Sequence, residues 1–303
     1  MRIAHFSDLH LLDLEGIPLR RFLNKRLTGY ANLRLKRNRV HRASYVRAIA
    51  QEVASQAFDH VVITGDLTNL ALESEYALAK EVIEHDLGLD PSHVTLVPGN
   101  HDLYTRGAQR TRRFFAYFGD YLKSDLPDLT TELATGAFPV VKLRGPAAFI
   151  ALSSAVASLP LLAFGSLGQP QLEALSKVLQ HPEVTCRTPV FALHHPALNP
   201  KSRLVTLLGG LRDAAHLQTA LQQVSRGLVL HGHLHHRGVR HLVTQRGTLH
   251  VVGATSASLH HEKPSHMAGF NVYRMEQDGV LGAMEAHVYN PGDHRFHTVS
   301  LPG

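Results

Sequence analysis

Five short clusters combine carboxylate, amide and imidazole side chains, and each follows a short apolar stretch of the sequence. They are Asp8-Leu9-His10, Gly65-Asp66-Leu67-Thr68-Asn69, Gly99-Asn100-His101-Asp102, His194-His195-Pro196 and Gly232-His233-Leu234-His235. Carboxylate oxygen, amide oxygen and imidazole nitrogen are suitable ligands for divalent ions such as manganese, iron or zinc. One such pair would mean little in a chain with 23 histidines, but five clusters in succession predict a metal site.

The apolar stretches before the clusters have the pattern of buried strands, and helical patterns separate them. In the first third of the chain the expected strands are 2–7, 61–64 and 94–97, and the expected helices are 44–57 and 73–87. Further on, the expected strands are 140–143, 149–152, 190–193 and 228–230, and the expected helices are 171–179 and 213–224. The last sixty residues alternate strand patterns with turns at 245–247 and 277–279.

This order of elements predicts an α/β fold in which sheets lie between helical layers, a four-layer αββα sandwich. We expect a single domain over residues 1–303. Functional sites of open α/β sheets lie at the carboxyl ends of the strands. The clusters occupy these ends, so the metal site is expected there.

The five clusters, in this order, resemble the motif set of the calcineurin-like metallophosphoesterases. The resemblance implies two divalent ions (manganese, iron or zinc) and attack on phosphorus by a hydroxide that bridges them. It further implies a first ion bound by Asp8, His10 and His235, a second bound by Asn100, His194 and His233, and Asp66 as the bridge.

Two assignments go beyond the ligand set itself. His194 and His195 are alternative ligands by sequence alone, because neighbours in an extended segment point to opposite sides; the resemblance favours His194. His101 resembles the family's substrate-side histidine, which stabilises the phosphoryl group or protonates the leaving oxygen. Asp102 is expected to orient the His101 ring.

A basic and apolar segment at about 17–42 separates the first cluster from the first expected helix. Its candidate substrate-binding residues are Arg20, Arg21, Lys25 and Arg26. The segment is either a solvated helix at the rim of the domain or an element that contacts a membrane surface. A second segment, at about 196–212, directly follows His194 and is a candidate lid.

Composition narrows the function classes further. The net charge of +6 favours anionic partners. One cysteine, Cys186, and the lack of a secretory signal pattern predict a cytoplasmic protein, with peripheral contact to an anionic membrane as a further expectation. Nucleic acid is not an expected partner, because no aromatic platform accompanies the basic residues.

Shared motifs leave the substrate open between two classes. The chain resembles hydrolases that cleave UDP-diacylglucosamine, a lipid-linked pyrophosphate, and it also resembles bacterial cyclic-nucleotide phosphodiesterases. The basic apolar segment favours the lipid-linked substrate. A non-catalytic metal-binding scaffold is a third hypothesis, which the completeness of the ligand set and the presence of His101 disfavour.

Overall fold

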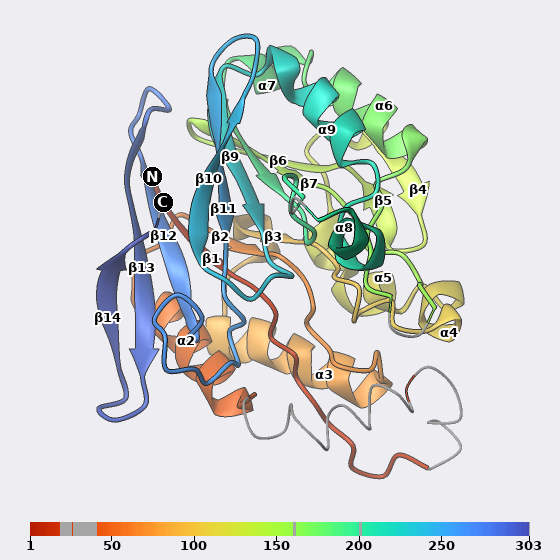
Figure 1. The fold of residues 1–303 in the computed structure, drawn as a ribbon, viewed down its shortest axis with the longest axis vertical. Helices are drawn as coiled ribbons and strands as arrows, with labels where there is room; N and C mark the ends of the chain where they lie inside the picture. The colour runs from red at the N-terminus through yellow and green to blue at the C-terminus, as the bar shows by residue number, and fades with distance from the viewer. Residues whose placement is uncertain (19–25, 27–40, 160–161, 200–201, 303) are drawn as a thin grey trace.

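A computed structural model describes residues 1–18, 26, 41–159, 162–199 and 202–302 (Figure 1). The strands are β1 Arg2–Phe6, β2 His60–Ile63, β3 Val94–Leu96, β4 Thr131–Leu133, β5 Gly136–Phe138, β6 Val140–Arg144, β7 Ala147–Ala151, β8 Thr188–Ala192, β9 Arg226–His231, β10 Gly238–Val243, β11 Thr248–Gly253, β12 Gly269–Met275, β13 Leu281–Asn290 and β14 Arg295–Ser300. The α-helices are α2 Ala43–Ser55, α3 Glu73–Glu81, α4 Arg106–Arg110, α5 Arg113–Phe118, α6 Gln169–Val178, α7 Pro182–Thr185, α8 Arg203–Gly209 and α9 Ala214–Ala220. Shorter helical turns are Val82–Leu87, Pro91–His93, Gly119–Leu122, Pro127–Leu129 and Leu221–Gln223.

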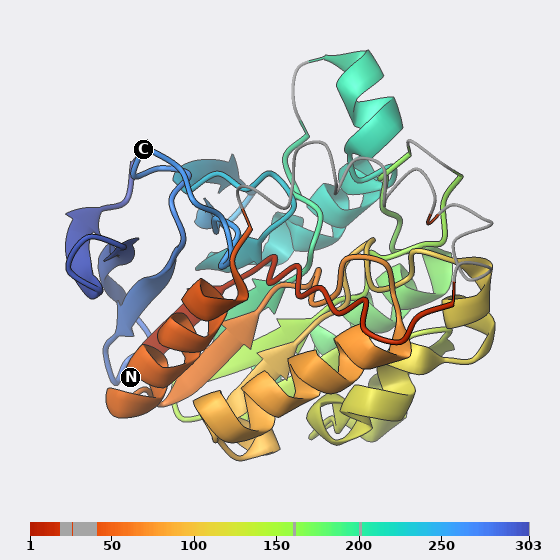
Figure 2. The same cartoon turned by 90° about the horizontal axis from the view of Figure 1, so that it is seen from below.

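Two six-stranded sheets face each other and helices cover their outer faces, as predicted. The first sheet has the order β14-β13-β12-β1-β2-β3, and the second has the order β10-β11-β9-β8-β7-β6. Helices α2 and α3 lie against the first sheet, and α6 and α9 lie against the second (Figures 1 and 2). The fold is therefore an αββα sandwich.

Strand β7 shows how the second sheet separates two apolar layers. Its residues Ala147, Phe149 and Ala151 belong to the core between the sheets. The alternate residues Ala148 and Ile150 belong to the core under α6 and α9. Successive side chains of a strand point to opposite faces, so this fully apolar strand is buried on both sides.

Parallel pairing brings the carboxyl ends of the strands that precede the five clusters to one edge of each sheet. Strands β1, β2 and β3 are mutually parallel, and so are β7, β8 and β9.

The helix expected over 73–87 is α3 followed by a π-helical turn over Val82–Leu87, which ends at Gly88 with φ of 62°. Among the described residues, no helix combines the length and the apolar character that crossing a bilayer requires.

Candidate metal centre

All seven sequence-predicted ligands come together where the carboxyl ends of the two sheets meet. Three of the strands that carry them, β1, β2 and β3, belong to the first sheet, and β8 and β9 belong to the second. Backbone bonds continue the pairing of β1 and β2 into the loops, from Asp8 N to Gly65 O and from His10 N to Asp66 O, both 2.9 Å. The clusters are thus fixed by the sheets themselves.

The first group of ligand atoms comes from Asp8, His10 and His235. His235 Nε2 lies 3.0 Å from Asp8 Oδ1 and 3.1 Å from His10 Nε2. His10 Nε2 also lies 3.8 Å from Asp8 Oδ1. Two imidazole nitrogens and a carboxylate oxygen therefore face one small volume, as ligands of one ion do.

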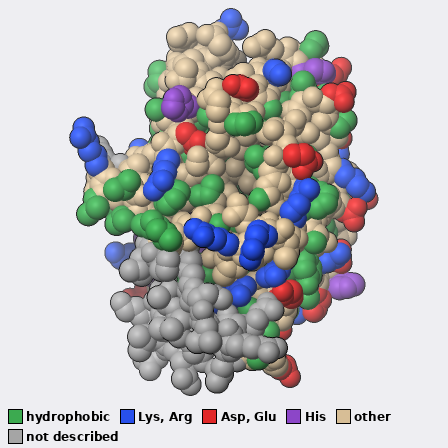
Figure 3. Space-filling view, turned by 90° about the vertical axis from the view of Figure 1, so that its right-hand side faces the viewer, with side chains coloured by type: hydrophobic (Ala, Val, Ile, Leu, Met, Phe, Trp, Pro, Cys, Tyr) green, Lys and Arg blue, Asp and Glu red, His purple; other side chains and the backbone are tan. Residues whose placement is uncertain are grey.

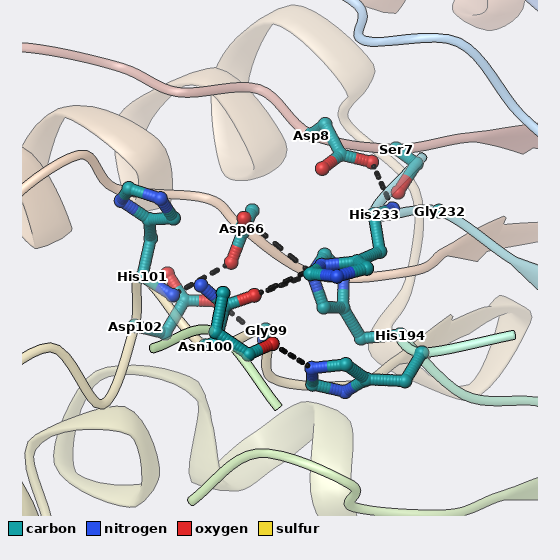
Figure 4. A network of polar contacts seen from close by, with 12 residues as sticks. Ser7, Asp8, Asp66, Gly99, Asn100, His101, Asp102, His194, Gly232 and His233 are labelled. Atoms are coloured by element: carbon teal, nitrogen blue, oxygen red, sulfur yellow. Dashed lines mark hydrogen bonds and ion pairs between the residues drawn. The ribbon is translucent and has the colours of Figure 1, made fainter. Parts of the chain in front are cut away.

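The second group comes from Asn100, His194 and His233 (Figure 4). Asn100 Oδ1 lies 3.1 Å from both His194 Nε2 and His233 Nδ1, and these two nitrogens are 3.3 Å apart. His194 Nδ1 donates to Thr64 O, and His233 Nε2 donates to Gly209 O, each at 2.7 Å. In the neutral form of each ring the proton lies on the outer nitrogen and the inner nitrogen presents a lone pair, which is the arrangement that a metal-binding histidine needs.

Asp66 lies between the two groups. Its Oδ2 is 3.8 Å from His10 Nε2 and 3.4 Å from His194 Nε2, and its Oδ1 accepts from the backbone N–H of His101 at 2.8 Å. A carboxylate in this position can contact ions in both groups. The donor set fits two divalent cations, since the nitrogen and oxygen donors of both groups converge around this buried carboxylate.

The charges at the centre also indicate a cation-binding site. Burial raises the pKa of Asp66, but His194 and His101 beside it bring the pKa well below its usual range. Burial lowers the pKa of His194, yet Asp66 and Asp8 raise it overall to about 9. The buried carboxylates thus hold a proton on a histidine that burial would otherwise keep neutral. A site that attracts one positive charge in this way is suited to bind cations.

The backbone of the ligands is unusual. Five of the eight described non-glycine residues with positive φ are proposed ligands, namely Asp8, His10, Asp66, His233 and His235, with φ between 45° and 67°. Such conformations cost free energy and are concentrated at functional sites.

His195 packs beside the second ligand group, with its ring centroid 4.5 Å from that of His233, but its ring nitrogens have other partners. Its Nδ1 lies 2.9 Å from Ser154 Oγ, and its Nε2 donates to Ala163 O at 2.9 Å. Neither nitrogen therefore belongs to the group around Asn100. Of the two sequence alternatives, the structure brings His194 to the centre.

His101 lies at the edge of the centre and its orientation differs from the expectation. Its ring meets the His10 ring edge-on with the centroids 4.9 Å apart, and its Nδ1 donates to the carbonyl oxygen of Asn69 at 2.7 Å. Contrary to the prediction, Asp102 does not orient this ring; it accepts from the backbone N–H groups of Gly99 at 2.9 Å and Thr68 at 3.0 Å. Asp102 is therefore a brace between two ligand loops.

The sequence did not predict the contacts of two further contributors: Asn69, which belongs to the second cluster but was not expected to be a ligand, and His41, which lies outside the clusters. Asn69 holds His101 through its backbone carbonyl and donates through its side chain to the carbonyl of His10. His41 packs edge-on against His10, with centroids 5.1 Å apart, and its Nδ1 lies 2.7 Å from Ser258 Oγ. Neither backbone carbonyls nor a lone histidine outside the clusters has a recognisable pattern.

Of the candidate substrate-binding residues, Arg20, Arg21 and Lys25 lie outside the described residues. Arg26 is buried, and its guanidinium donates to the carbonyl oxygens of Leu70 and Ala71 at 2.7 and 2.9 Å. The Arg26 side chain thus binds the loop after Asn69 rather than extending into solvent.

Fold and site together define a metal-dependent phosphoesterase. A sequence model of the calcineurin-like phosphoesterases matches residues 1–237, which include all five clusters. The chain belongs to this family and is a metallophosphoesterase, an enzyme that hydrolyses phosphoesters. No curated protein sequence matches the chain.

Solved structures with this fold are distant in sequence. A dimetal phosphatase from Danio rerio is 14% identical, with 99% of each chain covered and a TM-score of 0.52. A purple acid phosphatase from yellow lupin seeds is 15% identical, with 100% of this chain and 54% of that chain covered and a TM-score of 0.53. A sulfate thiohydrolase from Thermus thermophilus is 17% identical, with 97% and 57% covered and a TM-score of 0.53. These similarities establish the fold.

Proposed function

We propose that the protein hydrolyses a phosphodiester or pyrophosphate bond with two divalent ions, which are manganese, iron or zinc. Asp8, His10 and His235 would hold one ion, Asn100, His194 and His233 the other, and Asp66 would contact both. The observation that carries this proposal is the convergence of these donors in two groups around one buried carboxylate. Two such ions supply an activated water and stabilise charge on the attacking and leaving oxygens.

His101 is proposed as the group that serves the leaving oxygen. Because Nδ1–H donates to Asn69 O, Nε2 is the nitrogen assigned to the substrate. When the ring is doubly protonated, its Nε2–H group would donate to the phosphoryl group or transfer its proton to the leaving oxygen, which leaves the neutral ring with Nδ1–H still bound to Asn69 O. Asp66 Oδ1 supports this position, since it accepts the backbone N–H of His101. The role proposed for Asp102 is to fix the loops, not to move a proton.

The proposed substrate is lipid-linked, such as UDP-diacylglucosamine. The basic apolar segment at about 17–42 supports this, because a small cyclic nucleotide needs no such surface. Within that segment, Arg26 donates to the carbonyl oxygens of Leu70 and Ala71, directly after the residue whose carbonyl fixes His101. We therefore propose that Arg20, Arg21 and Lys25 contact the anionic part of the substrate or of its membrane.

A hydrolysis screen with the manganese-loaded protein tests this function. UDP-diacylglucosamine, cyclic nucleotides and a generic aryl phosphodiester are compared at equal concentration. We expect turnover of the aryl diester and faster turnover of the lipid-linked pyrophosphate. Preference for cyclic nucleotides would overturn the substrate class, and metal binding without hydrolysis of any of the three would instead favour a non-catalytic scaffold.

A further inference from the structure

Helix α8, within the segment predicted to be a lid, has no apolar residue in the core. Leu204 is 64% exposed, Val205 51%, Leu207 57% and Leu208 41%. A helix normally buries its apolar face against the domain that carries it. Contiguous exposed apolar side chains on a soluble domain mark a surface that contacts another phase or partner.

The helix is a projection with a fixed base. Figure 2 shows α8 standing off the body of the molecule. At its carboxyl end, Ala163 N donates to Leu208 O at 2.8 Å and Gly165 N donates to Gly210 O at 3.0 Å. Gly209 O accepts from Nε2 of His233, a proposed ligand. The base of the projection therefore lies at the metal centre.

Positive charge accompanies the projection. Helix α8 contains no acidic residue and begins at the exposed Arg203. Exposed Arg106 and Arg110 belong to α4, which lies on the same side of the molecule in Figure 1. Figure 3, which views that side, shows Lys and Arg side chains in a row next to the hydrophobic projection. Apolar side chains bordered by basic ones complement an anionic lipid surface, whose interior is apolar and whose headgroups are negative.

We propose that α8 docks the protein on an anionic membrane leaflet, assisted by the arginines of α4 further along the same side of the molecule. Leu204, Val205, Leu207 and Leu208 form one apolar face of this projecting helix, at positions i, i+1, i+3 and i+4. An interfacial helix buries such a face at the headgroup boundary of a lipid leaflet. Docking would bring the metal centre to the headgroups, through the short link from Gly209 to His233. In this respect the inference deepens the proposed lipid-linked function, but its test does not need hydrolysis.

Vesicle co-sedimentation of the metal-loaded full chain tests the apolar part of this surface. Vesicles are made of phosphatidylcholine alone or of phosphatidylcholine with phosphatidylglycerol. We expect the wild type to bind the anionic vesicles, and Leu204→Ser with Leu207→Ser to reduce partitioning about a hundredfold, since each inserted leucine contributes about a factor of ten. The matched control is Val243→Ser with Val280→Ser, two exposed apolar residues on other elements, which should bind like the wild type.

The contribution of the basic residues to vesicle binding is tested with the double variant Arg106→Ser and Arg110→Ser. At low salt each lost charge should reduce partitioning roughly fivefold, and high salt should remove the difference. Arg246→Ser with Arg295→Ser, exposed elsewhere, is the control. Circular dichroism and metal content establish that each variant is folded.

Equal binding by wild type and the α8 variant, or no binding to either vesicle, would overturn the proposal. So would a dimer in solution that the α8 substitutions dissociate, because a second copy of the chain would then cover the helix. Hydrolysis is scored separately with the lipid-linked pyrophosphate. Vesicle binding without cleavage would refute the proposed function alone, and cleavage without vesicle binding would refute docking alone.

Discussion

His101 lies next to the proposed ligands without occupying either group, so binding and chemistry are separable at this residue. Its ring contacts His10 and its Nδ1 is held by Asn69 O. We expect His101→Ala to retain both metal ions and to lose roughly 10²–10⁴-fold in turnover, the usual scale for a general acid. Metal analysis and steady-state kinetics with an alkyl leaving group measure the two effects.

His216→Ala, at an exposed histidine of α9, is the matched control and should match the wild type in both measurements. Near-wild-type turnover of His101→Ala on the alkyl leaving group would remove His101 from the role of proton donor. Loss of metal in this variant would show that it acts as a ligand.

Gly99 permits the close contact between two ligand loops. A Cβ atom at this position would lie 2.1 Å from Asp66 Oδ1 and 2.3 Å from Asp66 N. We expect Gly99→Ala to displace Asp66, reducing bound metal below two ions per chain and costing about 1–3 kcal/mol in unfolding free energy. Urea unfolding and metal analysis measure this. Gly107→Ala, whose Cβ would meet only Thr105 Oγ1 at 3.6 Å, should leave bound metal unchanged; equal behaviour of the two variants would contradict the steric argument.

Residue types and their order along the chain were sufficient to predict which side chains come together. They were not sufficient to predict how Asp102 and His101 are held. The partner of His101 is the backbone carbonyl of Asn69, and every residue has such a carbonyl. Likewise, the exclusion of His195 from the ligand groups depends on Ser154 and Ala163, which come from a distant part of the sequence.

At the scale of elements, the loop between β2 and α3 is clamped by one carboxyl group. Glu75 Oε2 accepts from the backbone N–H groups of Leu70 and Leu72, at 2.8 and 3.1 Å, and Oε1 is buried without a hydrogen-bond partner. Burial raises the pKa of Glu75 to about 8, although the two N–H donors and Arg26 act in the opposite direction. The native protein therefore keeps this carboxyl group protonated at neutral pH.

This raised pKa predicts a pH-dependent stability. Below the ordinary value of 4.5 both folded and unfolded states bind the proton, but between 4.5 and about 8 only the folded state does. The contribution of Glu75 to the unfolding free energy is thus complete at acid pH and is lost as pH rises to about 8, by at most about 1.4 kcal/mol per pH unit. Urea unfolding from acid to alkaline pH should show this slope in the wild type and not in Glu75→Gln.

The exposed Glu262→Gln is the control and should keep the wild-type slope. The comparison concerns the slope of the unfolding free energy against pH. A constant change in that free energy caused by the new amide therefore does not affect the comparison. Parallel curves for wild type and Glu75→Gln would mean that Glu75 is ionised in the folded protein.

The elements that could be predicted from the sequence are those with enough residues to show a period. Helix α2 buries Tyr45, Val46, Ile49 and Val53 on one side, and this spacing is visible in the sequence. Helices α4, α5 and α7 have only four to six residues, which is too short for a helical period, and they were not predicted. The exposure of α8 could not be predicted either, because its sequence is that of a core helix.

At the scale of the whole molecule, the proposed ions connect the two sheets. Asp8, His10, Asp66 and Asn100 follow strands of the first sheet, whereas His194, His233 and His235 follow strands of the second. Each ligand group includes residues from both sheets. Bound ions would therefore join the two sheets at one edge of the sandwich.

Metal loading should consequently stabilise the folded protein as well as activate the enzyme. After reconstitution with manganese, zinc or iron, we expect two ions per chain and an unfolding temperature that rises with metal concentration; an ion present at a thousandfold its Kd adds about 4 kcal/mol. Chelation should reverse the rise in unfolding temperature.

Asp66→Ala, which removes the carboxylate between the two ligand groups, should lose both the metal and this rise, whereas Asp128→Ala at an exposed position should retain both. A stoichiometry that stays at one or zero would rule out the binuclear assignment. Two ions without any stabilisation would mean that the ligand groups are equally formed in the unfolded chain, which ligands drawn from five strands of two sheets make physically unreasonable.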